Sequence, residues 1–255
     1  TYKRNHPKTR LISRDIADVD KIDLCKYGKT SVLFGGSPCQ GFSTSNQRTR
    51  NQDNPSNWLF KEFLRITKLW EPDWVVFENV RGIAETERGV FLDLIVHGFE
   101  ELGYTCSCSV LCASHFGVPQ TRSRFFLIAS RYGISLQISR PTNRRSVTVR
   151  QAIADLPSIG NGANIDYLPY SRKPRSNYAK SMRNGNEGCS GHLVTKNAPN
   201  IIERYAYIPQ GGNWEDIPEE LLSNYTDSKR CHTGIYRRLQ EDLPSVVIGN
   251  YRKNM

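Results

Sequence analysis

The chain has 255 residues, enough for one large domain or two smaller ones with a sizeable buried core. Its 35 lysine and arginine residues outnumber 25 acidic residues, and the net charge of +10 favours a polyanionic partner such as nucleic acid. No apolar run approaches the roughly 18 residues of a membrane span, and no signal peptide opens the chain. These features argue against a membrane partner and favour a cytoplasmic protein whose seven cysteines are reduced.

Strand and helix signals alternate through the first half of the chain. Short apolar runs predict strands, and apolar residues at helical spacing predict helices. In chain order these are a strand at 31–34, a helix at 57–70, a strand at 74–77, a helix at 89–102, and strands at 105–111 and 124–130. This alternation predicts an α/β fold in which a mostly parallel sheet carries helices on both faces.

Polar motifs follow two of the predicted strands. Pro38-Cys39-Gln40 comes after the strand at 31–34 and its two glycines, and Glu78-Asn79 comes directly after the strand at 74–77. Ligands of open α/β sheets bind at the carboxyl ends of the strands. We therefore expect both motifs to lie at a functional site.

The second half of the chain has a different character. Residues 148–156 are compatible with a short helix, but from Pro157 onward glycine, asparagine, proline and tyrosine are frequent and periodicity is weak. This composition predicts a smaller, loop-rich domain. One stretch within it combines Tyr178 with five basic side chains and no acid: Arg172, Lys173, Arg175, Lys180 and Arg183.

Taken singly, the candidate catalytic residues have ordinary structural explanations. A lone cysteine such as Cys39 is more often a buried core residue than a nucleophile. Glu78 is compatible with a helix N-cap or a sheet-end carboxylate, and Arg122 and Arg124 are compatible with solvated charge. The functional interpretation depends on these residues occurring together.

Three segments resemble the signature motifs of the DNA cytosine-C5 methyltransferase family. The first is Gly35-Gly36-Ser37-Pro38-Cys39-Gln40-Gly41-Phe42-Ser43, which resembles the family's catalytic loop. The second is Glu78-Asn79-Val80, and the third is Gly117-Val118-Pro119-Gln120-Thr121-Arg122-Ser123-Arg124. They occur in the family's order with ordinary spacing, and the likeness is close over 1–156 and looser beyond. The chain is therefore identified as a bacterial or phage-encoded member of restriction-modification type.

The resemblance implies transfer of a methyl group to C5 of a cytosine that is flipped out of duplex DNA. Cys39 corresponds to the family's nucleophile, whose thiolate adds to C6 of the ring. Glu78 corresponds to the carboxylate that contacts N3 and the exocyclic amine. Arg124 corresponds to the arginine near O2, with Arg122 beside it, where a cation stabilises the charge that builds on the ring.

The same resemblance implies that the methyl donor is S-adenosylmethionine. Asp15 and Ile16 correspond to a segment that meets the adenine, Pro38 borders the methyl donor, and Leu59 matches a position that packs near the cofactor. On the residues alone, a turn or helix-cap aspartate is the preferred interpretation of Asp15. The family's glycine-rich Phe-x-Gly-x-Gly loop, which cradles part of the cofactor, has no match in the chain.

The implied partner is double-stranded DNA. Gln40, Ser43 and Ser45 lie in the loop that closes over DNA in the family. In the recognition region, the basic residues expected to contact phosphates are Arg172, Lys173 and Arg175.

The resemblance also divides the chain into two domains. Residues 1–157 correspond to the catalytic domain and 158–255 to the target-recognition region. Both are expected to be incomplete, because the first cofactor motif and the last two family motifs are absent. We therefore expect activity to need flanking segments or a second chain, and a cognate restriction endonuclease is a further expected partner.

Metal binding is not expected. Cys106, Cys108 and Cys112 form a CxCxxxC pattern, but no fourth ligand is near and the context predicts a strand. Cys106, Cys108 and Val110 share one face of that strand at a period of two, which favours burial over metal ligation.

Two other functions stay open at the level of sequence. The first is a non-catalytic DNA-binding remnant or subunit, which the missing glycine-rich loop favours and the intact Cys39, Glu78, Arg122 and Arg124 oppose. The second is an RNA cytosine methyltransferase, because the family includes a tRNA-acting branch. The long region after Pro157 suits a DNA-recognition domain better.

Overall fold

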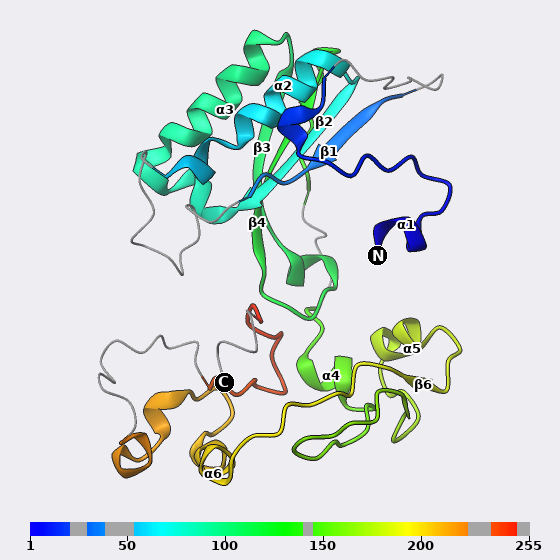
Figure 1. Ribbon diagram of the computed structural model, residues 1–255, viewed down its shortest axis with the longest axis vertical. Coiled ribbons are helices and arrows are strands. Elements are labelled where there is room, and N and C mark those ends of the chain that lie inside the picture. The colour runs from blue at the N-terminus through cyan, green and yellow to red at the C-terminus, as the bar shows by residue number, and fades with distance from the viewer. Residues whose placement is uncertain (21–29, 39–53, 140–144, 224–235, 249–255) are drawn as a thin grey trace. The chain divides into compact units, whose positions relative to one another are not determined.

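The structure is a computed structural model that describes residues 1–20, 30–38, 54–139, 145–223 and 236–248. Two compact units emerge from its contacts. The first comprises Thr1–Leu111 and Ser123–Ser139, and the second comprises Cys112–Arg122 and Arg140–Met255. Figure 1 shows the course of the chain through both. Within the described ranges, no helix is both long and apolar enough to cross a membrane.

The two units do not coincide with the predicted ranges of 1–157 and 158–255. Residues 112–122 and 140–157 belong to the second unit. Backbone hydrogen bonds explain this grouping, since Thr121 N donates to Ser245 O at 2.8 Å and Val149 N donates to Leu243 O at 2.9 Å. The assignment of catalysis to one range and target recognition to the other stays a prediction.

The regular elements up to residue 130 follow the predicted order closely. They are α1 (Tyr2–Asn5), η1 (Ile16–Asp18), β1 (Val32–Gly35), η3 (Pro55–Trp58), α2 (Phe60–Trp70), β2 (Trp74–Val80), η4 (Arg81–Ala84), η5 (Thr86–Gly89), α3 (Val90–Glu101), β3 (Thr105–Cys112), η6 (Ala113–Phe116) and β4 (Ser123–Ser130). The symbol η denotes a 3-10 helix. α2 ends where Glu71 adopts the left-handed conformation, one residue before Pro72, as expected of a proline that cannot continue a helix.

The described sheet is mixed, with the strand order β1-β2-β4-β3. β1 pairs with β2 in parallel, but β4 pairs with β2 in antiparallel orientation. The prediction of an α/β fold is confirmed, and the β1–β2 pair is parallel as predicted, whereas the β2–β4 pair is antiparallel. Between β3 and β4 the chain forms only the short η6, and a short connection favours chain reversal over a parallel crossover.

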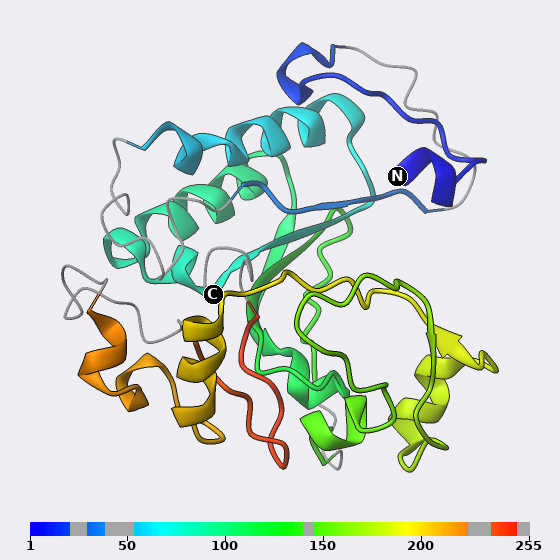
Figure 2. The same cartoon turned by 60° about the horizontal axis from the view of Figure 1, so that its bottom comes forward.

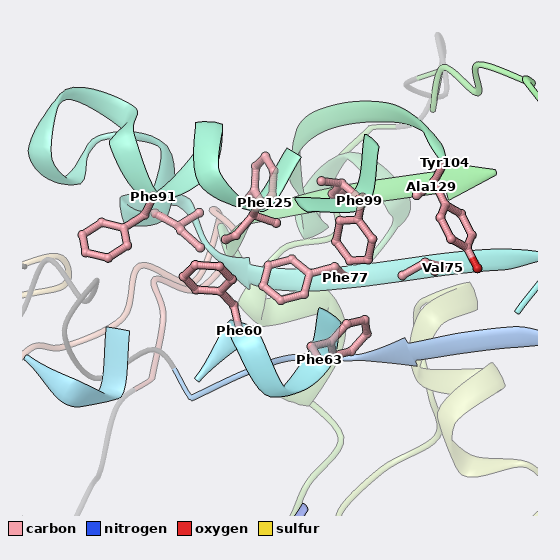
Figure 3. Packing of buried hydrophobic residues seen from close by; sticks show 12 residues of the cluster. Phe60, Phe63, Val75, Phe77, Phe91, Phe99, Tyr104, Phe125 and Ala129 are labelled. Carbon is pink, nitrogen blue, oxygen red and sulfur yellow. The ribbon is translucent and has the colours of Figure 1, made fainter. Parts of the chain in front are cut away.

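The main core lies on one face of this sheet. Alternate residues of β2 and β4 point into it, including Val75, Phe77, Phe125 and Leu127, all of them buried. Figure 3 shows their side chains meeting those of α2 and α3. Phe63 of α2 packs edge-on against Phe77, with ring centroids 5.3 Å apart.

Both long helices of the first unit cover that same face. α2 and α3 contact each other as well as the sheet. On the opposite face Phe34 is 77% exposed and Val32 is also exposed. Among the described residues, α2 and α3 therefore cover one face rather than the predicted two, and the opposite face carries the partly buried Val76, Phe126 and Ile128.

The second unit is loop-rich, as predicted. Its elements are α4 (Val149–Ile153), β5 (Leu168–Pro169), α5 (Asn177–Arg183), β6 (Gly188–Cys189), α6 (Pro199–Tyr207), η7 (Trp214–Asp216) and η8 (Glu219–Leu222). Figure 2 shows long irregular segments between these short elements. A small core of its own holds Ile208, Ile217, Leu222 and Tyr236.

The one-sided core generates a stability prediction. Phe77→Ala is expected to lower the free energy of unfolding by about 3–5 kcal/mol, because it leaves a cavity where the side chain is fully buried. Phe34→Ala on the neighbouring strand is the matched control and should change it by less than about 0.5 kcal/mol. Equal losses in urea-induced unfolding of the two variants would show that the core has been placed on the wrong face.

Candidate active site

The end of β1 lies beside the last residues of β2, because Gly35 is in parallel register with Phe77. Glu78 and Asn79 lie within β2 and not after the strand as predicted, since β2 continues to Val80 in its pairing with β4. The register of β1 with β2 brings Gly36 against Glu78, the next residue of β2. A Cβ atom on Gly36 would lie 2.7 Å from Oε2 and 3.0 Å from the carbonyl oxygen of Glu78. A side chain at position 36 would therefore require the end of the Glu78 side chain to move and would crowd the Glu78 carbonyl, so glycine suits this close approach.

Asn79 joins the same two segments by hydrogen bonds. Its side chain is buried, and its Nδ2 donates to the Ser37 hydroxyl at 3.2 Å and to the Ser37 carbonyl at 3.4 Å. Its Oδ1 accepts from the backbone N–H of Val80 at 2.8 Å. The sequence grouped Asn79 with Glu78 but assigned it no role. Its place in the short Glu-Asn-Val motif was the available signal.

Arg124 of β4 forms an ion pair with Glu78. Its Nε lies 3.0 Å from Oε1 of Glu78, and the two side chains are 18% and 40% exposed. Glu78 is in register with Phe126, and Arg124 lies two residues from that position on the same sheet face. Such diagonal neighbours on antiparallel strands are within reach of long side chains. The register of β2 with β4 therefore brings two predicted site residues together.

Ser37 and Pro38 lead from this point toward the predicted nucleophile. Cys39, Gln40, Ser43 and Ser45 lie outside the described residues. What the structure describes is the base of their segment, anchored by Asn79 beside a carboxylate and a guanidinium group. A partly exposed carboxylate and a cation at one sheet edge suit recognition of a polar heterocycle.

Arg122 belongs to the second unit, unlike Arg124. Its backbone carbonyl accepts from Ala113 N at 2.9 Å, and its side chain is partly exposed. Its role beside Arg124 stays a prediction.

The predicted cofactor residues occupy three segments, two of which lie beside α2. Asp15 caps η1 by accepting from Ala17 N at 2.9 Å, which confirms the helix-cap interpretation made from the residues alone. Arg65 of α2 donates to the carbonyls of Ile16, at 2.5 Å, and Val19, at 2.7 Å. These bonds hold the Asp15-Ile16 segment against α2.

The remaining cofactor candidates are surface residues. Leu59 immediately precedes α2, and Pro38 follows β1. The side chains of Ile16, Leu59 and Pro38 are all exposed. Exposed apolar side chains are available to cover a flat aromatic ligand.

The cysteines of β3 are poor candidates for catalysis. Burial raises the pKa of the Cys106 thiol to about 12, so this thiol is protonated at neutral pH and a weak nucleophile. Cys108 and Val110 are exposed and Cys106 is only partly buried, so the prediction that this strand face is buried is wrong for two of its three residues. Within the described residues, no three side chains of the metal-ligating types gather at one point.

The predicted phosphate contacts line a cleft in the second unit. This cleft, of about 490 Å³, lies beside α4 and α5 and is bordered by Arg172, Lys173 and Arg175. All three side chains are exposed. In the described part of the chain, no carboxylate forms an ion pair with any of them.

A buried ion pair adjoins the cleft, and sequence reasoning missed it. Nε of Arg183 lies 2.7 Å from Oδ2 of Asp155, and the two side chains are only 15% and 6% exposed. Arg183 had been grouped with the exposed basic residues. A run of like charges does not reveal which member turns inward.

Close contact at Gly36 generates a second prediction. Gly36→Ala is expected to lower the free energy of unfolding by about 1–3 kcal/mol, because the added methyl group overlaps Glu78. The control is Gly160→Ala, where a Cβ atom would meet nothing within 4 Å. Equal melting temperatures of the two variants, measured by circular dichroism, would contradict the close approach.

Comparison with known proteins gives a consistent picture. Residues 1–244 match the family described as C-5 cytosine-specific DNA methylase. The chain is 32% identical over 258 residues to Type II methyltransferase M1.HphI of Haemophilus parahaemolyticus, with 99% of this chain and 62% of the relative covered. It is 33% identical to Type II methyltransferase M.DdeI of Desulfomicrobium norvegicum over 86% of this chain and 55% of the relative.

A solved structure has a similar fold. It is described as a DNA modification methyltransferase encoded within an E. coli prophage, and it matches with a TM-score of 0.59 at 23% identity. That match covers 85% of this chain and 61% of the other. The chain thus spans little more than half the length of the relatives it matches. Since the family match extends over nearly all its residues, the chain belongs to the C-5 cytosine-specific DNA methylase family.

Proposed function

We propose that this chain carries the nucleophile and the cytosine-binding residues of an enzyme that methylates C5 of cytosine in duplex DNA. The observation that carries the proposal is the meeting of three segments at one sheet edge. Glu78 lies against Gly36, forms an ion pair with Arg124, and is followed by Asn79, which holds the segment leading to Cys39. Family membership implies direct contact with cytosine for Cys39, Glu78 and Arg124.

The first chemical step follows from the residue types. Cytosine C5 is a poor nucleophile until the ring is activated. Addition of the Cys39 thiolate forms a bond between sulfur and C6 and shifts the C5–C6 π electrons, so that C5 becomes nucleophilic. Glu78 contacts N3 and the exocyclic amine, and the guanidinium of Arg124 stabilises charge that builds near O2.

The second step transfers the methyl group and restores the ring. A sulfonium donor held beside Pro38 would supply the methyl group to the activated C5 and would leave as the neutral thioether. The C5 proton then leaves to a base, and the returning electrons expel Cys39 from C6. The target base must be rotated out of the duplex beforehand, at a cost of a few kcal/mol.

The methyl donor in this proposal is S-adenosylmethionine, whose sulfonium supplies an electrophilic methyl group. The residues present fit its adenine end, because the exposed Ile16 and Leu59 side chains offer apolar surface and Arg65 anchors the Asp15-Ile16 segment. Pro38, beside the predicted nucleophile, would border the methyl end.

Duplex DNA is the proposed substrate, and 158–255 is the proposed target-recognition region. Gln40, Ser43 and Ser45 would contact DNA near the target base. The cleft in the second unit supports a further contact, because Arg172, Lys173 and Arg175 present cations to solvent. The bacterial relatives are named Type II methyltransferases, so we include a cognate restriction endonuclease among the proposed partners.

Covalent trapping tests the chemistry directly. The full-length protein is mixed with S-adenosylmethionine and duplex DNA that carries 5-fluorocytosine at many sites. Fluorine does not leave as a cation, so the adduct through Cys39 cannot resolve and should survive denaturing electrophoresis. Cys39→Ser should abolish the trapped complex.

The matched control is Cys108→Ser, which removes an exposed cysteine of β3 and should leave trapping intact. Failure of the folded, cofactor-bound protein to form any adduct would reject the catalytic proposal and favour a non-catalytic DNA-binding subunit. Labelling of tRNA in preference to DNA would reject the substrate.

The proposed phosphate contacts generate a prediction of their own. Each phosphate contact contributes about 0.9 to the slope of log affinity against log salt concentration, so Arg175→Ala should reduce that slope by about one. Arg175→Lys keeps the charge and should keep the slope. Fluorescence anisotropy titrations at several salt concentrations measure both, and an unchanged slope for the alanine variant would exclude Arg175 from the phosphate contacts.

A further inference from the structure

The basic segment of the second unit is held at both ends. At its start, Ser171 donates from its backbone N to the Asp155 carbonyl at 2.9 Å and from its hydroxyl to the Leu156 carbonyl at 2.9 Å. At its end, the hydroxyl of Ser176 donates to the Gln151 carbonyl at 2.5 Å. Both anchor points lie in or just after α4. The residues between them form a short bridge along the cleft.

The partly buried side chain of Arg183 binds the first residue of this bridge. Its Nε donates to the buried carboxylate of Asp155, and its guanidinium lies over the ring of Tyr170, 3.8 Å from the centroid. A second nitrogen of the same group donates to the backbone carbonyl of Arg172. One planar side chain thus connects α5, the residue after α4, and the first residue of the bridge.

The charges around the cleft divide into two classes. Arg183 and Arg150 are neutralised, the first by Asp155 and the second by Glu241 and Asp242. The bridge residues are exposed and have no ion-pair partner among the described residues: Arg172, Lys173 and Arg175. Asp155 is the one acid among the residues that border the cleft, and its carboxylate is bound by Arg183.

We propose that the buried Asp155–Arg183 pair is a positioning device that presents Arg172, Lys173 and Arg175 together to consecutive phosphates of duplex DNA. This inference rests on the proposed function, because it takes duplex DNA as the ligand. Arg183 and Asp155 do not themselves touch DNA. They set the backbone path of the residues that do, and only a planar, forked donor reaches Asp155, Tyr170 and the Arg172 carbonyl at once.

A change of net charge and a loss of positioning predict opposite effects on DNA affinity, which makes the two distinguishable. Asp155→Asn makes the protein more positive, which on charge alone strengthens binding to a polyanion. If the pair positions the bridge, the same change instead weakens duplex binding by about tenfold or more. Arg183→Lys keeps the charge but loses the fork, and it should weaken binding similarly. The matched control is Glu187→Gln, a nearby exposed acid whose removal should leave binding unchanged or slightly tighter.

The measurement is fluorescence anisotropy of the full-length protein with a labelled duplex at several salt concentrations. Loss of positioning should reduce the slope of log affinity against log salt by about two to three, since two or three phosphate contacts are lost together. If part of a variant's molecules were simply unfolded, the concentration of active protein would fall but the slope of log affinity against log salt would not change. Circular dichroism melting identifies any variant that does not fold.

If Asp155→Asn fails to fold, Arg183→Lys replaces it, because this change keeps the charge and removes the fork that joins Asp155 to the Arg172 carbonyl. Duplex binding by Asp155→Asn or Arg183→Lys that equals that of the Glu187→Gln control overturns the positioning role. If 5-fluorocytosine trapping stays intact in that case, the proposed function survives. Absence of duplex binding by the unsubstituted protein, or tighter binding of tRNA, overturns both.

Discussion

The site depends on the parallel pairing of β1 with β2. Parallel neighbours end at the same edge of a sheet, so the residues that follow them are close in space although far apart in sequence. Here the register of Gly35 with Phe77 brings Gly36 against Glu78, and the contact is possible because Gly36 has no side chain. Asn79 then holds Ser37 by its amide group. A shift of one residue would turn Glu78 into the core and break this arrangement.

Side chains of β2 alternate between the two faces of the sheet. Phe77 and Asn79 point toward the side that α2 and α3 cover, whereas Glu78 between them points to the other side. β4 repeats the pattern, since Phe125 is buried in the core and Arg124 reaches Glu78. Because the core anchors both strands, the carboxylate and the guanidinium are held by rigid elements and not by loops.

In the second unit, polar groups hold the basic segment in place instead of a large apolar core. Its main apolar cluster, around Ile208 and Tyr236, does not include the basic segment. That segment is held by serine hydroxyls, a buried ion pair and a guanidinium–aromatic contact. Breaking such a pair by removing one partner leaves a buried charge without compensation, which makes its members sensitive positions in an otherwise tolerant region.

By itself the sequence determined the element order and the family motifs. Helix and strand positions up to Ser130 agree within a few residues, because the periodicity of apolar residues and terminators such as Pro72 are local signals. The motifs around Cys39, Glu78 and Arg124 were recognisable because the chemistry depends on residue types in short contiguous segments. The loop-rich character of the second half was equally visible in its composition.

Only the tertiary structure decided which neighbours these residues have. The antiparallel placement of β4 beside β2, the one-sided helical layer and the Glu78–Arg124 pair arise from contacts between segments distant in sequence. The same holds for Arg183, which sequence alone grouped with the exposed bases around Arg172. Its burial against Asp155 depends on α5 packing beside α4. Local sequence patterns determine whether a segment forms a helix or a strand. The partner of a charged side chain is decided only when the chain folds and removes that side chain from water.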